Sequence, residues 1–369
     1  MKNVGILTGG GDAPGLNAVI RAAVIRLVRE RKDYNVIGLI DGWAGLRDKN
    51  ANPLSPSIVD EIAHQGGTIL GTSRTNLYKK GKEGDIAKAV NSYNQLNLEA
   101  LIAIGGDDTL EIAYYLGRDH KLNIVGVPKT IDNDVCGTDF TFGFWSSVEQ
   151  ATEAIDDLRV TTMSHHRVMV IECMGRHAGW ITAYTGLASE ADYIAVPEKS
   201  VHIDTITNEV KNCRASGKLH SIVVVAEGAS IAGIDVKPRV VKSEKGEWEM
   251  SKVVEKDNFD NIVLRPGEVA EAVAYAIEHK TGIETRAIAL GHLQRGGSPC
   301  AYDRILGTRY GVKAAEAVIE GNFGHMVVMN GLDVFTRPMS GLVREGQGEH
   351  KKYKLLPDEF LKLAEVFYE

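Results

Sequence analysis

The chain has 369 residues, about two and a half times the length expected of one domain, so we expect two domains that each bury a core. Hydrophobic residues make up 44% and charged residues 25%, which excludes a disordered or coiled-coil protein. The formal net charge is −7, so the overall charge does not favour binding to nucleic acid or to an anionic membrane.

Short apolar runs rich in β-branched residues recur along the chain. They occupy residues 4–8, 36–40, 100–104, 124–127, 168–171, 193–196, 222–226, 287–290 and 326–329. Such runs are typical of strands buried on both faces, and stretches with helical periodicity, such as residues 16–31, 142–163 and 269–279, lie between them. The alternation predicts an α/β protein with doubly wound, mostly parallel sheets. Its ligands should bind in loops at the carboxyl ends of the strands.

The alternation weakens in two places. Residues 232–264 are rich in mixed charges and poor in apolar side chains, which predicts a charged surface insertion that could be a hairpin. Residues 331–369 look like a C-terminal extension that ends in a helix near residues 358–369. The apolar residues of that helix could dock on the body of the protein; they are Phe360, Leu361, Leu363, Ala364 and Phe367.

The cysteines and the amino terminus indicate where the protein works. The four cysteines, Cys136, Cys173, Cys213 and Cys300, are far apart and show no CxxC spacing, which favours reduced thiols over disulfides or a zinc site. The amino terminus runs into a predicted strand without a signal-peptide pattern, and no apolar run approaches the ~18 residues of a membrane span. We therefore expect a cytoplasmic protein with no membrane or nucleic-acid partner.

A glycine-rich loop, residues 8–15 with the sequence TGGGDAPG, follows the first predicted strand and leads into a helix. Backbone N–H groups at such a turn point into the loop at the positive end of the helix dipole, which is an arrangement that binds anions. The loop matches neither the dinucleotide fingerprint nor the P-loop, because it lacks the P-loop lysine and has Pro14 where the fingerprint needs glycine. Alone, it is as consistent with a plain tight turn as with a phosphate site.

Two adjacent carboxylates, Asp107 and Asp108, follow another predicted strand at the start of a helix near Thr109. Aspartates in this position commonly cap the helix. Alternatively, one of them holds Mg²⁺, which prefers a few carboxylates together with substrate phosphates. The two residues by themselves leave both interpretations open.

A third loop, residues 127–134 with the sequence VPKTIDND, carries a cation, a hydroxyl and two carboxylates. With a phosphate nearby, Lys129 could balance its charge, and Asp132 could take a proton from an attacking hydroxyl. An Asx-type turn without a ligand is the alternative.

Five motifs, taken together and in order, resemble the signature of the phosphofructokinase family over residues 1 to about 330. They are GGDAPGLN at residues 10–17, GGD at 105–107, TIDND at 130–134, MGR at 174–176 and GHLQRGG at 291–297. The resemblance implies two α/β domains with the active site in the cleft between them. We expect a phosphoryl-donor domain at residues 1–140, to which the chain returns near residues 255–305. A sugar-phosphate domain is expected at residues 141–254, with part of residues 306–330 packed on it.

The resemblance also implies roles for individual residues. Asp132 corresponds to the base that deprotonates the 1-hydroxyl of the sugar, Asp107 to the Mg²⁺ carboxylate and Arg176 to the group that stabilises the transferring phosphoryl group; Thr130 belongs to the same catalytic set. Contacts to the sugar phosphate are implied for Thr130, Asp132, Asp134, Met174, Gly175, Arg176, Glu227, His292 and Arg295. Arg167 and Arg286 correspond to arginines that family members lend across a subunit interface to the 6-phosphate, which implies a homodimer or homotetramer.

Two positions separate this sequence from the ATP-dependent bacterial members, which have glycine where this chain has Asp108 and Lys129. A carboxylate at position 108 would occupy the space of a nucleotide α-phosphate, and like charges ~4 Å apart repel by up to ~4 kcal/mol at an effective dielectric constant of 20. Lys129 could instead bind the leaving phosphate of a shorter donor. The pair resembles the pyrophosphate-dependent branch of the family, whose donor-side residues would here also include Gly11 and Arg74.

Residues around the expected adenine position also disfavour ATP as the donor. Glu111 and Ile112 replace the small residues of ATP users, and Trp43 stands where those members often have tyrosine. The allosteric bacterial members bind nucleotide effectors with several basic residues, and this chain keeps only part of that set. Arg21, Arg159 and Lys218 are present, whereas Ile25 and Ser216 fall where arginine and lysine are expected. The resemblance therefore implies little response to ADP or phosphoenolpyruvate.

The implied reaction is the reversible transfer of a phosphoryl group from pyrophosphate to the 1-hydroxyl of fructose 6-phosphate, with Mg²⁺ as cofactor. It yields fructose 1,6-bisphosphate and phosphate, a step of glycolysis and gluconeogenesis. An ATP-dependent 6-phosphofructokinase is the nearest alternative. A non-catalytic regulatory subunit that binds sugar phosphates is an alternative of another class, and a broader range of ketose phosphate acceptors also stays open.

Overall fold

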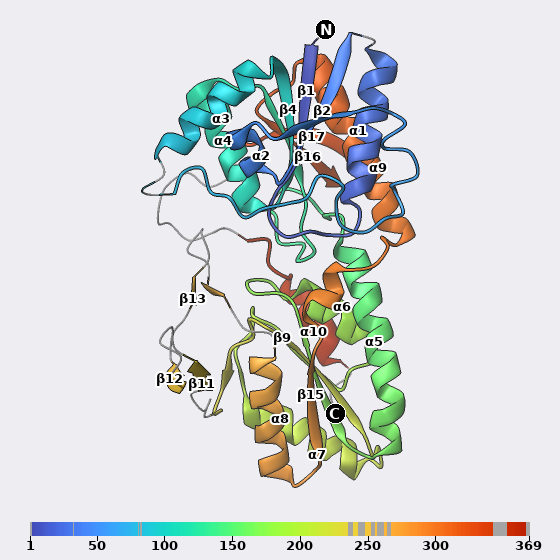
Figure 1. Ribbon diagram of the computed structural model, residues 1–369. Helices are drawn as coiled ribbons and strands as arrows, with labels where there is room; N and C mark the ends of the chain where they lie inside the picture. The colour runs from blue at the N-terminus through green and yellow to red at the C-terminus, as the bar shows by residue number, and fades with distance from the viewer. Residues whose placement is uncertain are drawn as a thin grey trace. The chain divides into compact units, whose positions relative to one another are not determined.

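The computed structural model describes residues 2–31, 33–79, 81, 83–234, 239–242, 248–251, 255–256, 262–263, 267–341 and 353–366. The chain divides into two compact units, each made of two segments (Figure 1). Unit 1 comprises Met1–Glu149 and Arg295–Lys354, and unit 2 comprises Gln150–Gln294 and Leu355–Glu369.

Unit 1 contains a seven-stranded sheet. Its strands are β1 (Lys2–Thr8), β2 (Tyr34–Leu39), β3 (Ala51–Leu54), β4 (Leu98–Gly105), β5 (Ile124–Pro128), β16 (His325–Asn330) and β17 (Asp333–Pro338). They follow the order β17-β16-β5-β4-β1-β2-β3. All neighbours pair in parallel except β3 on β2 and β17 on β16, the two edge strands.

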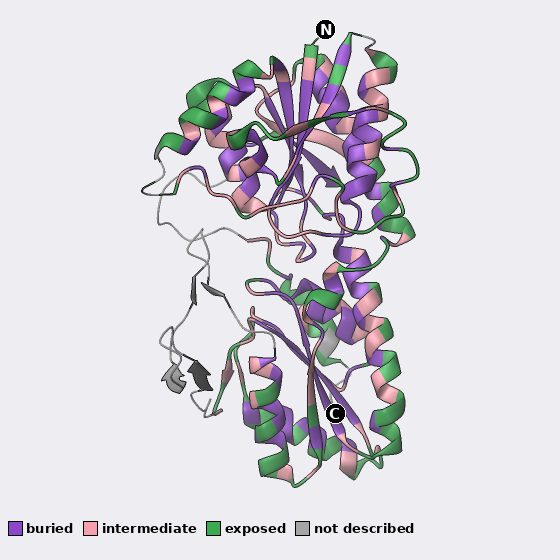
Figure 2. Cartoon of the chain, viewed as in Figure 1, coloured by how far each residue is buried: buried purple, intermediate pink, exposed green. Residues whose placement is uncertain are grey.

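The helices of unit 1 are α1 (Leu16–Glu30), α2 (Trp43–Asp48), α3 (Glu83–Gln95), α4 (Asp107–His120) and α9 (Ala301–Glu320), while α5 (Phe144–Ser164) runs from unit 1 into unit 2. In Figure 1, α1 and α9 lie on one side of the sheet and α3 and α4 on the other, which is the doubly wound arrangement. The apolar face of α1, including Val19 and Leu27, joins strand residues such as Ile102 in one buried core (Figure 2).

Unit 2 is built on a parallel four-stranded sheet in the order β15-β6-β9-β7. These strands are β6 (Val168–Cys173), β7 (Tyr193–Ala195), β9 (Ser221–Ala226) and β15 (Thr285–Ala289). The helices are α6 (Trp180–Ala188), α7 (Ile203–Ala215), α8 (Glu268–Thr281) and α10 (Asp358–Glu365), and a 3₁₀ turn, η1, covers Gly291–Arg295. Two short strands, β8 (Val201–His202) and β10 (Ile231–Ala232), pair in parallel.

The prediction of an α/β fold with mostly parallel sheets is confirmed. Every predicted apolar run forms a strand, because each central strand is covered on both faces, as the fully buried β9 shows. The edge strand β17 was not predicted, since its residues are half-buried or exposed and carry no apolar run. None of the described helices is long and apolar enough to cross a membrane.

The structure corrects the predicted course of the chain between the domains. Of the expected return at residues 255–305, only residues 295–305 lie in unit 1, because α8 and β15 pack against β6 in unit 2. Residues 306–330 belong to unit 1 and not to the second domain, since α9 packs along α1.

The predicted insertion at residues 232–264 lies mainly outside the described residues. Its described parts include β11 (Arg239–Lys242) and β12 (Trp248–Ser251), which pair antiparallel, and the short antiparallel pair of β13 (Glu255–Lys256) with β14 (Ile262–Val263).

The terminal helix is present as α10, and Phe360 stacks on Tyr184 with ring centroids 4.6 Å apart. Leu363 is 47% exposed and does not dock, and Phe367 lies outside the described residues.

Candidate active site

Three neighbouring strands of unit 1 bring together the three loops singled out in the sequence. Thr8 of β1 pairs with Ile104 of β4, and Gly105 of β4 pairs with Pro128 of β5. Because parallel strands end at the same edge of a sheet, the glycine loop, the two aspartates and the segment from Lys129 lie side by side.

Hydrogen bonds fix the position of the glycine loop at this edge. Gly9 N–H donates to Ile104 O at 2.9 Å, and Gly10, with φ of +82°, donates to Ser73 O at 3.1 Å. A Cβ atom on Gly11 would lie 2.4 Å from Nη1 of Arg295, whose Nη1 donates to Asp12 O at 3.0 Å. Arg295, for which the resemblance implies a contact to the sugar phosphate, therefore lies beside Gly11, which is expected on the donor side.

Lys129 is the buried cation of this edge, with only 3% of the residue exposed. Its Nζ donates to the carbonyl of Gly11, and its own N–H donates to Gly105 O at 2.9 Å. Burial lowers the pKa of Lys129 to about 7, and the positive charge of Arg295 adds to this effect. Since burial of an ammonium is costly, a bound anion would stabilise its protonated form.

Asp107 and Asp108 lie in the first turn of α4, where the helix dipole favours negative charge. The N-cap position itself is taken by Gly106, which makes no side-chain capping bond. The capping alternative therefore does not describe these two residues. Both are partly exposed and can reach a ligand at the strand edge.

The loop after Lys129 places further carboxylates here. Oδ1 of Asp132 is buried and makes no hydrogen bond within the described part of the chain, while its N–H donates to Thr130 Oγ1 at 3.1 Å. A buried carboxylate oxygen without a protein partner is costly in a folded protein, so a water, an ion or a substrate group is expected to meet it. The pKa of Asp134 is raised well above its ordinary value by burial and by the negative charges of Asp132 and Asp107.

The donor set of this edge fits a hard divalent cation. Among the described residues, Asp107 and Asp132 lie close enough to Asp134 for their charges to raise its pKa, so carboxylate oxygens gather here. Over those same residues, no group of three or more His, Cys, Asp or Glu side chains is placed to hold an ion without help. Mg²⁺ is commonly held by one or two carboxylates together with water and substrate phosphates.

Unit 2 has a corresponding edge. Cys173 of β6 pairs with Ala226 of β9, and Ala289 of β15 pairs with Glu172, so the loops after these three strands adjoin. They carry the other predicted sugar-phosphate residues, which are Met174, Gly175, Arg176, Glu227 and His292.

Close packing fixes the loop that holds Arg176. Nε of Arg176 lies 3.4 Å from Oε1 of Glu227. Gly175 has φ of +134°, and a Cβ atom there would lie 2.7 Å from Ala178 O, so only glycine fits. This ion pair fixes the guanidinium of Arg176 beside Glu227 in the loops after β6 and β9.

Arg167 and Arg286 lie at the opposite end of the unit 2 sheet. Arg167 precedes β6, and Arg286 pairs with Met169 near the start of that strand. Both contact Glu284, at 3.6 Å and 2.8 Å. With ~3.3 Å of rise per residue, Arg167 lies about 23 Å from Met174 along β6, and Arg286, level with Met169, lies about 17 Å from it.

Arg74 is exposed in unit 1, and its charge helps to lower the pKa of Lys129. Of the residues predicted to disfavour adenine, Trp43 and Ile112 are buried core residues of unit 1. Only the partly exposed Glu111 can face a ligand.

Sequence reasoning missed residues that support the site. Glu172 accepts hydrogen bonds from the N–H groups of Gly267, Val269 and Ala270 and so caps α8. A carboxylate inside the apolar run of β6 was the available signal. Lys354 contacts the loop after Asp132. No sequence pattern indicated this contact, because Lys354 lies in the C-terminal extension, far along the chain.

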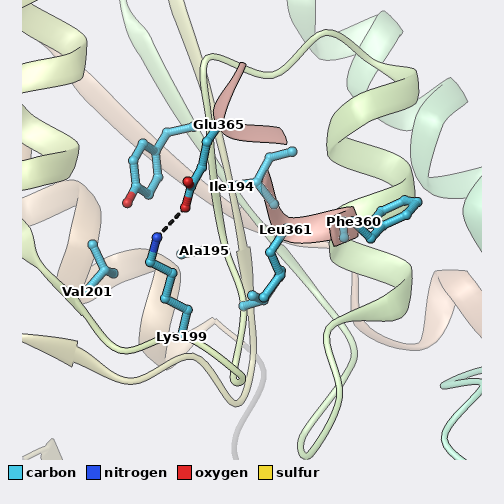
Figure 3. Close-up of a pocket in the computed structure, with 10 residues that line it drawn as sticks. Ile194, Ala195, Lys199, Val201, Phe360, Leu361 and Glu365 are labelled. Carbon is cyan, nitrogen blue, oxygen red and sulfur yellow. Dashed lines mark hydrogen bonds and ion pairs between the residues drawn. The ribbon is translucent and has the colours of Figure 1, made fainter. Parts of the chain in front are cut away.

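A small pocket in unit 2 lies apart from these residues (Figure 3). It is lined by residues of β7 and α10, with Lys199 and Glu365 paired across it. None of its lining residues is a predicted site residue.

Parallel sheets whose strand edges gather glycine loops, aspartates and basic side chains are typical of α/β proteins that bind phosphates. The family model described as phosphofructokinase matches residues 3–318. The chain belongs to the phosphofructokinase family.

Curated relatives include enzymes named for either donor. The pyrophosphate–fructose 6-phosphate 1-phosphotransferase of Amycolatopsis methanolica is 45% identical over 366 residues, which cover 99% of both chains. The ATP-dependent 6-phosphofructokinase 3 of Streptomyces coelicolor is 44% identical and covers 90% of this chain and 92% of its own.

Among solved structures, phosphofructokinase of Saccharomyces cerevisiae matches with a TM-score of 0.75 and 29% identity. The match covers 93% of this chain and 45% of the yeast chain, so this chain spans less than half of that protein.

Proposed function

We propose that the chain transfers a phosphoryl group reversibly between pyrophosphate and the 1-hydroxyl of fructose 6-phosphate. Residues of unit 1 bind the donor, and Met174, Gly175, Arg176, Glu227 and His292 of unit 2 bind the sugar phosphate. Buried Lys129, set between the glycine loop and Asp132, is the observation that carries this proposal. It offers a compact cation to a small inorganic donor.

Donor choice rests on two neighbouring positions. Asp108, in the first turn of α4, adds negative charge where a longer nucleotide would continue past the transferred group. Lys129 supplies positive charge to the leaving phosphate. The relative named for pyrophosphate matches over 99% of this chain and the one named for ATP over 90%, at 45% and 44% identity, which supports pyrophosphate. Asp108 and Lys129 are the residues proposed to make that choice.

The proposed transfer relies on positioning and charge neutralisation, as phosphoryl transfer does generally. Asp132 accepts the proton of the 1-hydroxyl through its unpartnered oxygen. Arg176 neutralises charge on the transferring group. Asp107, with Asp132 and Asp134 nearby, would hold Mg²⁺, which supplies charge neutralisation for the phosphates when bound.

The deciding experiment compares initial rates with pyrophosphate and with ATP on fructose 6-phosphate in saturating Mg²⁺. The proposal expects turnover with pyrophosphate and weak or no turnover with ATP. A higher kcat/KM for ATP would make the chain an ATP-dependent enzyme. Binding of sugar phosphate without turnover of either donor would indicate a regulatory subunit.

Pyrophosphate binding should depend on pH through Lys129. Its pKa of about 7 leaves the ammonium partly deprotonated before binding, and the pyrophosphate anion favours the charged form. The KM for pyrophosphate should therefore rise above pH 7, by up to about tenfold per pH unit. Lys129→Arg is the control because arginine stays protonated. An identical pH slope in both proteins would contradict this role.

Arg167 and Arg286 are proposed to serve the 6-phosphate of a neighbouring subunit, in a homodimer or homotetramer. Their distance from Met174 along β6, about 23 Å for Arg167 and about 17 Å for Arg286, supports this, because it places both arginines away from the ligand proposed for the loop at Met174. Arg286→Ala should raise the KM for fructose 6-phosphate about tenfold or more, with less change in the KM for pyrophosphate. An active monomer in sedimentation would exclude the shared site.

The enzyme is proposed to be non-allosteric. Lys218 pairs with Asp192, and Arg159 donates to Ser189 O, so both basic residues are engaged within unit 2. We expect no several-fold change in rate when ADP or phosphoenolpyruvate is added at physiological concentration. Several-fold activation by either compound would show that an effector site persists.

The cytoplasm is the proposed compartment. The four cysteines are free thiols in the structure, and two of them are buried, as in proteins kept in a reducing environment.

A further inference from the structure

The loop that carries Asp132 is closed on itself. Thr141 Oγ1 donates to Thr130 O at 2.7 Å, and Thr141 N–H donates to Asn133 Oδ1 at 3.1 Å. Asn133 is fully buried and has φ of +51°. Asparagine adopts this left-handed conformation more readily than most residues, and here its side chain is tied to the loop by the bond from Thr141 N–H. The position of Asp132 therefore depends on what fixes Asn133.

Lys354 fixes this loop from the C-terminal segment, 221 residues along the chain from Asn133. Its Nζ donates to Asn133 Oδ1 at 2.9 Å, to Thr138 O at 3.0 Å and to Asp139 O at 2.6 Å. Its backbone N–H donates to Asp134 O at 2.8 Å. Since a lysine ammonium has three N–H donors, the three oxygens satisfy all of them, and none remains for a substrate.

The charge of Lys354 also acts on the carboxylates. Burial and the charges of Asp132 and Asp107 raise the pKa of Asp134, whereas Lys354 opposes that rise. Burial in turn lowers the pKa of Lys354 to about 8, against the negative charges of Asp134 and Asp139 and the contribution of Cys136. Each member of the Lys354–Asp134 pair thus favours the charged form of the other.

We propose that Lys354 is a positioning residue for phosphoryl transfer, which holds the loop of residues 130–141 so that Asp132 faces the sugar hydroxyl. The inference rests on the proposed function and gives the C-terminal segment a part in the same site. Lys354 acts through the loop and touches neither substrate.

The activity test compares Lys354→Met, Lys354→Arg and the exposed control Lys362→Met. Lys354→Met should lower kcat about ten- to hundredfold, the cost of small misplacements, while the KM for pyrophosphate changes less than about threefold. Arginine should restore most of the rate.

Hydrogen exchange of the peptide covering residues 130–141 gives a readout that needs no substrate. Faster exchange in Lys354→Met than in the wild type and Lys362→Met, with an unchanged melting temperature, would support the proposal. Unchanged exchange, or a kcat within about twofold of the wild type, would overturn it. If exchange is faster in Lys354→Met than in the wild type but the wild type does not use pyrophosphate, the proposed function is refuted instead.

Discussion

Replacing Asp132 with alanine is expected to lower kcat for transfer from pyrophosphate to fructose 6-phosphate by a factor of about 10² to 10⁴, the usual share of a general base. The reason lies in its buried Oδ1, which makes no hydrogen bond within the described residues and can accept the proton of the attacking hydroxyl. Because this interaction develops in the transition state, kcat should fall more than either KM rises. Steady-state kinetics with both substrates measures the difference.

An exposed aspartate of the same unit provides the control. Asp60, whose side chain is 70% exposed and lies 4.0 Å from Arg21, should tolerate alanine without loss of rate. The Asp132→Ala protein must keep the wild-type melting temperature for the comparison to hold. Unchanged turnover in a folded Asp132→Ala protein would remove the residue from the mechanism.

The second large effect concerns the donor. Lys129→Ala should reduce kcat/KM for pyrophosphate about 10²- to 10³-fold, since it removes a buried cation that stabilises the leaving phosphate. Asp108→Gly should raise kcat/KM for ATP, by up to about 10³-fold if the whole repulsion of ~4 kcal/mol is relieved. Rates with both donors on each variant and on the double variant separate the two roles.

Lys88→Met, with a side chain 66% exposed on α3, is the matched control for loss of a lysine in unit 1. It should leave the ratio of the two donor activities as in the wild type. If neither Lys129→Ala nor Asp108→Gly changes that ratio, donor choice lies elsewhere in the chain, and the assignment of these two residues fails.

Local sequence was sufficient to predict the strands and the loops that follow them. A central strand such as β9 must be apolar on both faces, so its own residues are enough to predict it, without knowledge of the strands beside it. Lys129 and Asp132 follow β5 directly, and Asp107 follows β4 after Gly106, so their placement at a strand edge came from the same signal. The motif resemblance then supplied roles that spacing alone left open.

Long-range contacts decided the rest. The grouping of Arg295 with Gly11, the packing of α9 on α1 and the bond from Lys354 to Asn133 each join segments distant along the chain. No local pattern records such contacts, because each depends on how the units fold around their sheets.

The sequence by itself determined that this is an α/β chain with acidic and basic groups after successive strands. Strands buried on both faces form continuous apolar runs, which can be recognised in the sequence alone. Only the tertiary structure decided that Lys129 is buried, with a pKa of about 7, and that Oδ1 of Asp132 makes no hydrogen bond to any described residue. Desolvation and charge proximity arise from the whole surroundings of a group in three dimensions, which is why neither property can be read from its neighbours in the chain.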